Sequence, residues 1–260
     1  MKIPDRIPSI PIRRDIHARC ASVEERGTSI VDIGYESVPE NTCLALDADT
    51  SVVVGKQIGE GLQGYVYELA NCPDVCIKLC KNDRAAKQFR RELLGYGHYV
   101  SLDMPCPVIV GADGAGRWIL KERWADDVPS GAALLQREGR VLKREFVRLL
   151  GSYVRHFEEA GWCVDGTPSN VVFLSNGCGN FETTLWPCRS SESWTFARCF
   201  LPMWLPHVVP QVSEHGWPPF NLPPGLVGEL RKEWLSAPSY APWREVFGDF
   251  PDLCPEWWTA

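Results

Sequence analysis

The stretch GEGLQGYVY, residues 59–67, places three glycines between two segments rich in branched and aromatic residues. The segments SVVVGKQIGEG and YVYEL have strand composition, so the pattern predicts a β-hairpin with a glycine-rich connection. Without a Cβ at Gly59, Gly61 and Gly64, backbone N–H groups can approach a phosphate closely. A plain hairpin turn fits the same letters, so both interpretations stay open here. A dinucleotide-binding fingerprint does not fit, because it needs a helix directly after the glycines.

A lysine lies in the next apolar segment, VCIKLC at residues 75–80, which predicts a short strand. Side chains alternate along a strand, so Lys78 should share a face with Cys76 and Cys80. Burying a lysine among apolar residues is costly without a partner. We therefore consider two interpretations of Lys78, a phosphate-binding lysine beside the glycines or an exposed lysine on an edge strand.

The segment NDRAAKQFRRELLGYG predicts a helix that begins at Asn82 or Asp83, either of which is a good N-cap. Gly95 or Gly97 is expected near its end. Glu92 on this helix is a candidate partner for Lys78, and a solvated helix face is the alternative. The following segment, CPVIVGADGAGRWILKER, predicts two strands around a tight Asp-Gly turn.

A second helical pattern extends over residues 137–160 and ends before Gly161, a good stop residue. Its apolar residues recur at helical spacing and form one stripe: Phe146, Leu149, Leu150, Tyr153, Val154 and Phe157. Beyond Pro187, prolines exclude long helices in LPMWLPHVVPQ and WPPFNLPPG, and GLVGELRKEWLS is a plausible single helix. The tryptophans of this region are expected to be mainly buried packing residues.

Between these parts lies DGTPSN, residues 165–170, before an apolar segment. Asp165 could accept a proton from a hydroxyl group, and Asn170 could bind a magnesium ion from the same loop. An Asx turn ahead of a strand is the alternative for either residue. The next letters predict a hairpin of NVVFLS and FETTLW, turned by NGCGN.

Taken in order, these motifs resemble the protein-kinase-like family. GEGLQGYVY looks like its glycine-rich loop, VCIK like its lysine motif, and DGTPSN like its catalytic loop. The resemblance implies an α+β, bilobal fold with a small β-rich N-lobe and a shortened helical C-lobe that has a Pro/Trp-rich irregular tail. The expected parts are a flexible N-terminal arm (1–43), the N-lobe (44–122) and the C-lobe (123–260).

The resemblance also implies roles in binding ATP with Mg²⁺ or Mn²⁺. Lys78 would contact the α- and β-phosphates and pair with Glu92, Asp165 would be the catalytic base, and Asn170 would be a metal ligand. The other residues assigned to the nucleotide are Gly59, Gly61, Gly64, Val66 and Cys76. ILKERWA, residues 119–125, would be the hinge between the lobes.

Several letters depart from the family pattern. Cys163 and Val164 replace the H-R pair before the catalytic aspartate, and the A-P-E motif is absent. The D-F-G aspartate is missing, and Glu182 is the only acid in FETTLWP, where we expect it. Either Glu182 binds the metal in an altered geometry or the protein is a pseudokinase. The short C-lobe is similar to that of compact kinases that some bacteria inject into host cells.

Composition limits the possible partners. The net charge of −6 argues against general binding to nucleic acid. No apolar run approaches the length of a membrane span, and no signal peptide is recognised. The 11 cysteines lack zinc-type spacing, so we expect reduced thiols in a reducing compartment. Cytoplasmic location is expected, with secretion into a host cell by a non-classical route as the variant.

The leading hypothesis is an ATP-dependent phosphotransferase that acts on Ser, Thr or Tyr hydroxyls of a protein substrate. The first alternative is a pseudokinase that binds a protein partner, such as a host protein. The second is a small-molecule kinase, for which Thr167 gives no support because that resemblance prefers a histidine there. The substrate and the oligomeric state are not encoded in any motif that we recognise.

Overall fold

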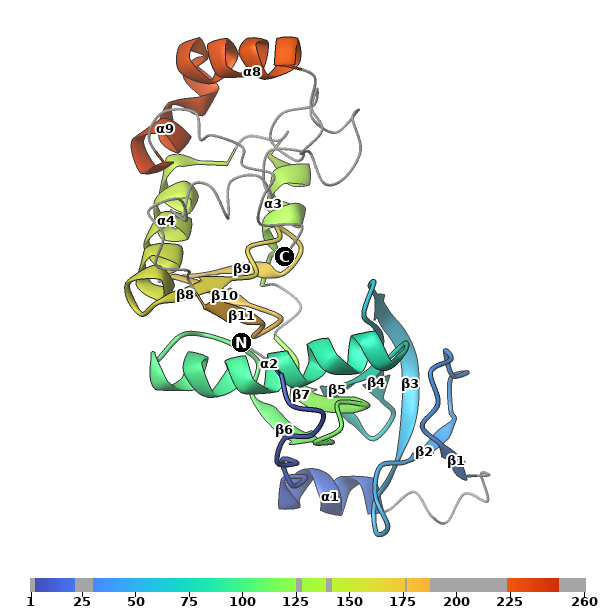
Figure 1. Ribbon diagram of the computed structural model, residues 1–260. Helices are drawn as coiled ribbons and strands as arrows, with labels where there is room; N and C mark the ends of the chain where they lie inside the picture. The colour runs from blue at the N-terminus through green and yellow to red at the C-terminus, as the bar shows by residue number, and fades with distance from the viewer. Residues whose placement is uncertain are drawn as a thin grey trace. The chain divides into compact units, whose positions relative to one another are not determined.

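The computed structural model describes residues 3–21, 30–124, 128–138, 142–175, 177–187 and 224–247. The chain forms two compact units, Met1–Ala125 and Asp126–Ala260 (Figure 1). The first is built around a large sheet and the second around helices with two short two-stranded sheets, so the predicted α+β class with two parts is confirmed. Among the described helices, none combines the length and the apolar character needed to cross a membrane.

The first unit contains a seven-stranded sheet in the order β1-β2-β3-β4-β5-β7-β6. Its strands are β1 (Ile30–Asp32), β2 (Cys43–Ala45), β3 (Ser51–Glu60), β4 (Gly64–Leu69), β5 (Cys72–Cys80), β6 (Ile109–Ala112) and β7 (Trp118–Glu122). All neighbours pair antiparallel except β1 and β2. Both hairpins expected from the sequence, β3–β4 and β6–β7, are present.

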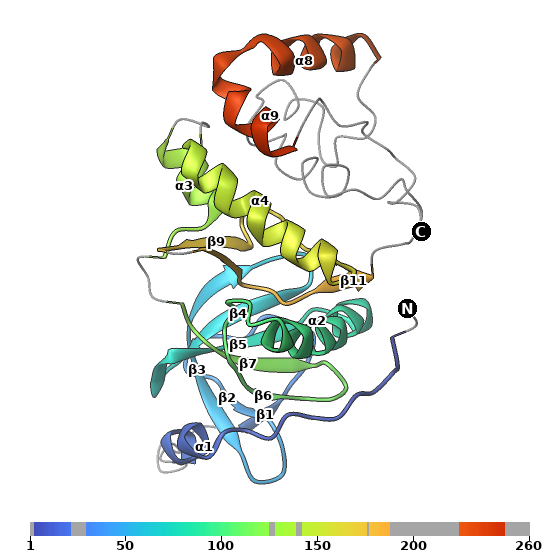
Figure 2. The same cartoon turned by 90° about the vertical axis from the view of Figure 1, so that its left-hand side faces the viewer.

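Helix α2 (Asp83–Ser101) covers one face of this sheet (Figure 2). The side chain of Asn82 accepts a hydrogen bond from the backbone N–H of Ala85 at 2.9 Å, which confirms it as the N-cap. The helix continues past Gly95 and Gly97, where the sequence suggested its end. Its apolar positions explain this extension, because Tyr99 is fully buried beyond both glycines.

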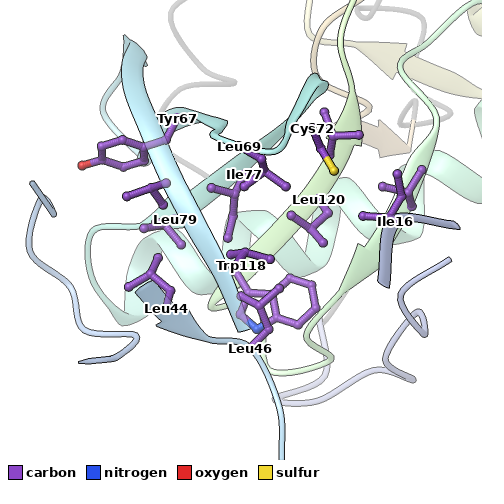
Figure 3. Packing of buried hydrophobic residues seen from close by; sticks show 14 residues of the cluster. Ile16, Leu44, Leu46, Tyr67, Leu69, Cys72, Ile77, Leu79, Trp118 and Leu120 are labelled. Atoms are coloured by element: carbon purple, nitrogen blue, oxygen red, sulfur yellow. The ribbon is translucent and has the colours of Figure 1, made fainter. Parts of the chain in front are cut away.

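The alternation of side chains along β5 separates two cores. Ile77 and Leu79 point into a cluster on the face away from α2 (Figure 3). Cys80 points to the α2 face, where it packs in a cluster with Phe89 and Ile119. The sheet is therefore covered on both faces, and β5 is a buried central strand rather than an edge.

The N-terminal segment differs from the flexible arm that the sequence suggested. The backbone of Ile7, Ile10 and Arg13 bonds to the β6 edge and its turn. Helix α1 (Arg14–Ala21) then inserts Ile16, which is fully buried, into the core of Figure 3. The segment packs because isoleucines recur at nearly every third position between its prolines. Its loop-like composition concealed this apolar pattern.

A second contact joins this segment to α2. The guanidinium of Arg90 donates to the backbone carbonyls of Pro4 at 2.9 Å and Ala115 at 2.6 Å. Arg90 therefore connects the helix, the N-terminal segment and the β6–β7 turn. Within the described residues, the segment is an integral part of the first unit.

The second unit contains helices α3 (Gly131–Arg137), α4 (Arg144–Glu159), α8 (Pro224–Ser236) and α9 (Ala241–Phe247) with the 3₁₀ turn η3 (Pro238–Tyr240). Its short strands are β8 (Trp162–Val164), β9 (Val171–Leu174), β10 (Gly177–Asn180) and β11 (Leu185–Pro187). The helical pattern expected at residues 137–160 corresponds to α4, which begins later than expected, and α3 before it was not predicted. Gly161, with φ of +83°, follows the end of α4 as predicted.

The predicted hairpin of NVVFLS and FETTLW is wrong in its second strand. Strand β9 pairs with β10, which is formed by GCGN itself, so the turn is much tighter than expected. Strand β11 pairs instead with β8, the strand before the DGTPSN loop. Small residues at Gly177 and Gly179 hid β10, because glycine is depleted in strands.

The apolar stripe of α4 is the buried face of the helix, with Leu150, Tyr153, Val154 and Phe157 buried. Gly151 lies where α4 meets α9, and a Cβ there would come within 2.2 Å of Val246. Trp234 and Trp243 are buried packing residues, as expected. Residues 188–223 of the predicted Pro/Trp-rich irregular region lie outside the described residues.

Candidate functional site

The first unit contains a buried ion pair between strand β5 and helix α2. The ammonium of Lys78 lies 3.0 Å from a carboxylate oxygen of Glu92. Both side chains are almost inaccessible, with exposures of 5% and 1%. Burying a charged pair is costly, and both residues stay ionised only because each has a partner of opposite charge. The structure thus brings together the two residues that the sequence suggested as partners.

A third charged side chain, Lys121 of β7, completes this cluster. Its ammonium contacts the other carboxylate oxygen of Glu92, and its exposure is 6%. Lys121 lies opposite Cys76 in the β5–β7 register, and Lys78 lies opposite Ile119. Sequence reasoning missed Lys121 because ILKERWA was interpreted as a hinge. Its residues 119–122 belong to strand β7, which the sequence also predicted, and a lysine inside that apolar strand was the available signal.

The cluster lies in an apolar frame supplied by α2. The Lys78 ammonium is 4.7 Å from the centre of the Phe89 ring, within the range of a cation–π contact. Cys76 lies on the same strand face two residues before Lys78. Burial raises the pKa of the Cys76 thiol above its usual value, so the thiol is neutral at pH 7. Cys76 is consequently a small, uncharged neighbour of the lysines.

The two lysines determine the charge state of Glu92. Burial alone would raise the pKa of Glu92, and the charges and hydrogen bonds of Lys121 and Lys78 overcome that effect. The pKa of Glu92 is therefore lower than its usual value. The carboxylate stays ionised at neutral pH and accepts from both lysines.

The glycine-rich connection between β3 and β4 is a tight turn in which the N–H of Gly61 donates to the carbonyl of Gly64 at 3.0 Å. A Cβ at Gly64 would lie 2.5 Å from the carbonyl oxygen of Leu79 and 2.8 Å from Phe89. Gly61, in contrast, has open space around it, and Gly59 has only ordinary contacts. Gly64 is thus needed for packing, whereas packing gives no reason for Gly61.

The neighbourhood of the turn places other expected residues. Val66 on β4 lies opposite Lys78, so the two side chains share the α2 face of the sheet. Leu62 at the turn is 96% exposed. Lys81 bridges the end of β5 to Glu60 at the end of β3, with a distance of 2.6 Å. The glycine turn therefore lies at the end of β4 that is nearest to the Val66–Lys78 pair.

In the second unit, the DGTPSN loop forms a compact turn. A carboxylate oxygen of Asp165 accepts from the backbone N–H of Thr167 at 3.1 Å and from its hydroxyl at 2.7 Å. This is the Asx turn considered as an alternative in the sequence. The turn is compatible with a catalytic role, because its hydrogen bonds hold the Asp165 carboxylate in one orientation.

Hairpin β9–β10 brings Asn170 and the residues after β10 together. The carbonyl of Asn170 accepts from the backbone N–H of Phe181 at 2.8 Å. Next to it, Asn180 is fully buried, and its side chain is held at both ends. Its amide nitrogen donates to the carbonyl of Asp165, and its amide oxygen accepts from the N–H of Glu182 at 3.1 Å.

Asn180 is the residue that sequence reasoning misplaced. The D-F-G aspartate was expected on or after the second strand of the hairpin, in FETTLWP, whereas the second strand in the structure is β10, which ends at Asn180. The triplet Asn180-Phe181-Glu182 therefore follows the resemblance, with asparagine in the place of aspartate. The phenylalanine after Asn180 was the available signal, and the wrong hairpin partner concealed it. Glu182 remains a predicted metal ligand, two residues beyond Asn180.

The metal implied by the resemblance can be tested against these donors. Within the described residues, no group of three or more His, Cys, Asp or Glu side chains could bind a metal. The amide of Asn180 is already occupied by backbone groups. Magnesium is usually bound by one or two carboxylates together with substrate phosphates. Asn170 and Glu182 fit an ion that arrives with a nucleotide, and they do not form a cage by themselves.

Three solved structures similar to this chain are protein kinases. One is a Stt7 homologue from Micromonas algae soaked with ATP, with 16% identity, TM-score 0.39, and coverage of 51% of this chain and 49% of that chain. Vaccinia related kinase 3 has 16% identity, TM-score 0.42, and coverage of 58% and 53%. The BubR1 kinase domain has 15% identity, TM-score 0.43, and coverage of 74% and 65%.

The chain spans about half to two thirds of the length of the three solved kinase chains. No protein-family model matches the chain, and no curated protein matches it. With identities of 15–16% and TM-scores below 0.5, the functional case rests on this chain's own residues.

Proposed function

We propose that the chain binds ATP and transfers its γ-phosphoryl group to a hydroxyl group of a protein substrate. The observation that carries the proposal is the buried pair of Lys78 and Glu92. Such a pair is costly to bury, and fixing a cation for a ligand is one role that would justify the cost. A fixed ammonium on the strand that pairs with the strand after the glycine turn suits the phosphates of a nucleotide.

The chemistry divides between the two units. In the first, Lys78 would attract the phosphates, and the open surroundings of Gly61 would let backbone approach them. In the second, Asp165 would accept the proton of the substrate hydroxyl while the hydroxyl oxygen forms a bond to the γ-phosphorus. The bond between that phosphorus and the bridging oxygen breaks, and ADP leaves with the electron pair. Thr167 would position the carboxylate of Asp165 through its two hydrogen bonds.

A bound Mg²⁺ or Mn²⁺ would offset phosphate charge during this transfer. Asn170 and Glu182 are the residues proposed to hold it. Asn170 directly precedes β9 and Glu182 follows β10, so both lie beyond the paired residues Val171 and Asn180. Both supply oxygen ligands of the kind these ions prefer.

Transfer of radiolabelled phosphate from ATP, with Mg²⁺ or Mn²⁺, tests the proposal. We expect Asp165→Ala to reduce incorporation into a protein substrate at least about 100-fold, the usual contribution of a positioned base. Glu159→Ala, an exposed acid in the same unit, is the matched control and should leave incorporation unchanged. Equal incorporation by wild type and Asp165→Ala would remove the base from the proposal.

One observation favours a second candidate, a pseudokinase that binds a protein partner. Asn180 occupies the place expected for the D-F-G aspartate, and both ends of its side chain bind backbone. A thermal-shift assay separates the candidates, because ATP at 100 times its dissociation constant should stabilise the protein by about 2.7 kcal/mol. No shift with ATP, together with a stable complex with a protein that survives Lys78→Ala, would favour the pseudokinase.

The cellular setting stays a prediction. We propose delivery of the chain by a bacterium into a host cell, where the substrate or partner would be a host protein, because the missing H-R pair and the absent A-P-E motif resemble compact kinases that some bacteria inject. Detection of the chain in host cytoplasm during infection is the corresponding test.

A further inference from the structure

Glu92 divides its two carboxylate oxygens between two lysines from neighbouring strands. One oxygen contacts Lys78 of β5 and the other contacts Lys121 of β7. All three side chains are buried within the first unit. These three groups therefore contain two cations and one anion, which is more positive charge than the Lys78–Glu92 pair requires.

The geometry keeps the two ammonium groups close together. Each is hydrogen-bonded to the same carboxylate, so they lie within roughly 8 Å of each other by ordinary bond lengths. Lys121 lies opposite Cys76, two residues before Lys78, so both lysines extend from the same face of the sheet. Buried charges at this separation are weakly screened by salt, and each changes the affinity of the other for an anion.

We propose that Lys121 is a positioning and charge-supplying residue for the polyphosphate of a nucleotide. It holds one oxygen of Glu92, which orients the carboxylate toward Lys78, and it adds a second positive charge beside the phosphates. This inference rests on the nucleotide-binding part of the proposed function and not on phosphoryl transfer. Its ligand class is a compound with linked phosphate groups.

Calorimetric binding to three ligands separates charge from structure. The ligands are ATP, inorganic tripolyphosphate, which lacks the nucleoside, and adenosine, which lacks the phosphates. The variants are Lys121→Met, Lys121→Gln, which keeps a donor for Glu92, and Lys121→Arg, which keeps the charge. Lys87→Met removes an equal charge from an exposed position on α2 and is the matched control.

We expect Lys121→Met and Lys121→Gln to weaken ATP and tripolyphosphate binding about tenfold, as the loss of one nearby charge should. Adenosine binding should not change. Lys121→Arg should bind within about threefold of wild type, and Lys87→Met should match wild type. Met and Gln differ in polarity, so if one of the two variants fails to fold, the other still measures the effect of the lost charge.

Two results would overturn the inference while leaving nucleotide binding intact. One is wild-type affinity of both neutral variants for tripolyphosphate. The other is an equal loss of adenosine binding, which would mean that Lys121 only supports the fold. If wild type binds neither ATP nor tripolyphosphate, the inference and the proposed function both fail. If the expected pattern appears without phosphoryl transfer, the inference stands and the proposed transfer fails.

Discussion

The side chain of Asn180 donates a hydrogen bond to the backbone carbonyl of Asp165, so the end of strand β10 is joined to the proposed catalytic loop. The same side chain accepts from the N–H of Glu182 at 3.1 Å. One buried amide thus holds two loops of the second unit in place. An aspartate could not make both contacts while ionised, because a carboxylate has no donor.

We predict that Asn180→Asp destabilises the protein at pH 7. The carboxylate would leave the carbonyl of Asp165 without this donor and would be buried with its charge, at a cost of about 1–3 kcal/mol. Urea unfolding measures the change. Asn170→Asp, at a partly exposed position, is the control and should cost much less. Equal stability of Asn180→Asp and wild type would show that the hydrogen bond from Asn180 to the Asp165 carbonyl does not stabilise the fold.

The depressed pKa of Glu92 predicts a pH-dependent contribution to stability. A carboxyl group with a lower pKa in the folded state stabilises the fold above its unfolded pKa of about 4.3. That stability is lost as the pH falls through the lower folded value. Glu92→Gln should therefore reduce the free energy of unfolding by about 3 kcal/mol at pH 7, since it removes one partner of a buried cluster.

Urea unfolding of wild type and Glu92→Gln across the acid range checks the sign of this effect. The difference between the two proteins should be complete above about pH 5 and should shrink as the pH falls below 4. A difference that stays constant through the acid range would show that Glu92 is not the group that titrates.

The glycine turn predicts opposite behaviour for two of its residues. Gly64→Ala should destabilise the protein by about 1–3 kcal/mol, because its Cβ would press on the Leu79 carbonyl and Phe89. Gly61→Ala has open space and should leave stability equal or slightly greater. Thermal unfolding compares them, and an unstable Gly61→Ala would contradict the described turn. An ATP affinity lowered in Gly61→Ala alone would mark that residue as functional.

The packed N-terminal segment predicts that Ile16 stabilises the first unit. Ile16→Ala should cost about 2–5 kcal/mol, as expected for a fully buried isoleucine. Arg14→Ala, at an exposed position of the same helix, should change stability by less than about 0.5 kcal/mol. Chemical denaturation distinguishes them. If both changes are equally small, the segment is the loose arm that composition suggested.

Sequence patterns were reliable where one period dominates. The glycine hairpin, the strand of Lys78 and the helix of Glu92 follow from alternation, helical spacing and an N-cap, all of which are local. The patterns failed at GCGN, where glycine hides a strand, and at the N-terminal segment, where prolines hide apolar contacts. In both places the structure depends on partners far along the chain, and local propensity is a weak guide.

The sequence by itself determined the types of residue available for the chemistry and their order: small residues, a lysine, a glutamate and an acid–amide loop. Only the tertiary structure decided that Glu92 serves both Lys78 and Lys121, and that Asn180 is bound to backbone at both ends. The reason is physical. Composition and spacing act over a few residues, whereas strand β7 reaches Glu92 only after the sheet order has placed it beside β5.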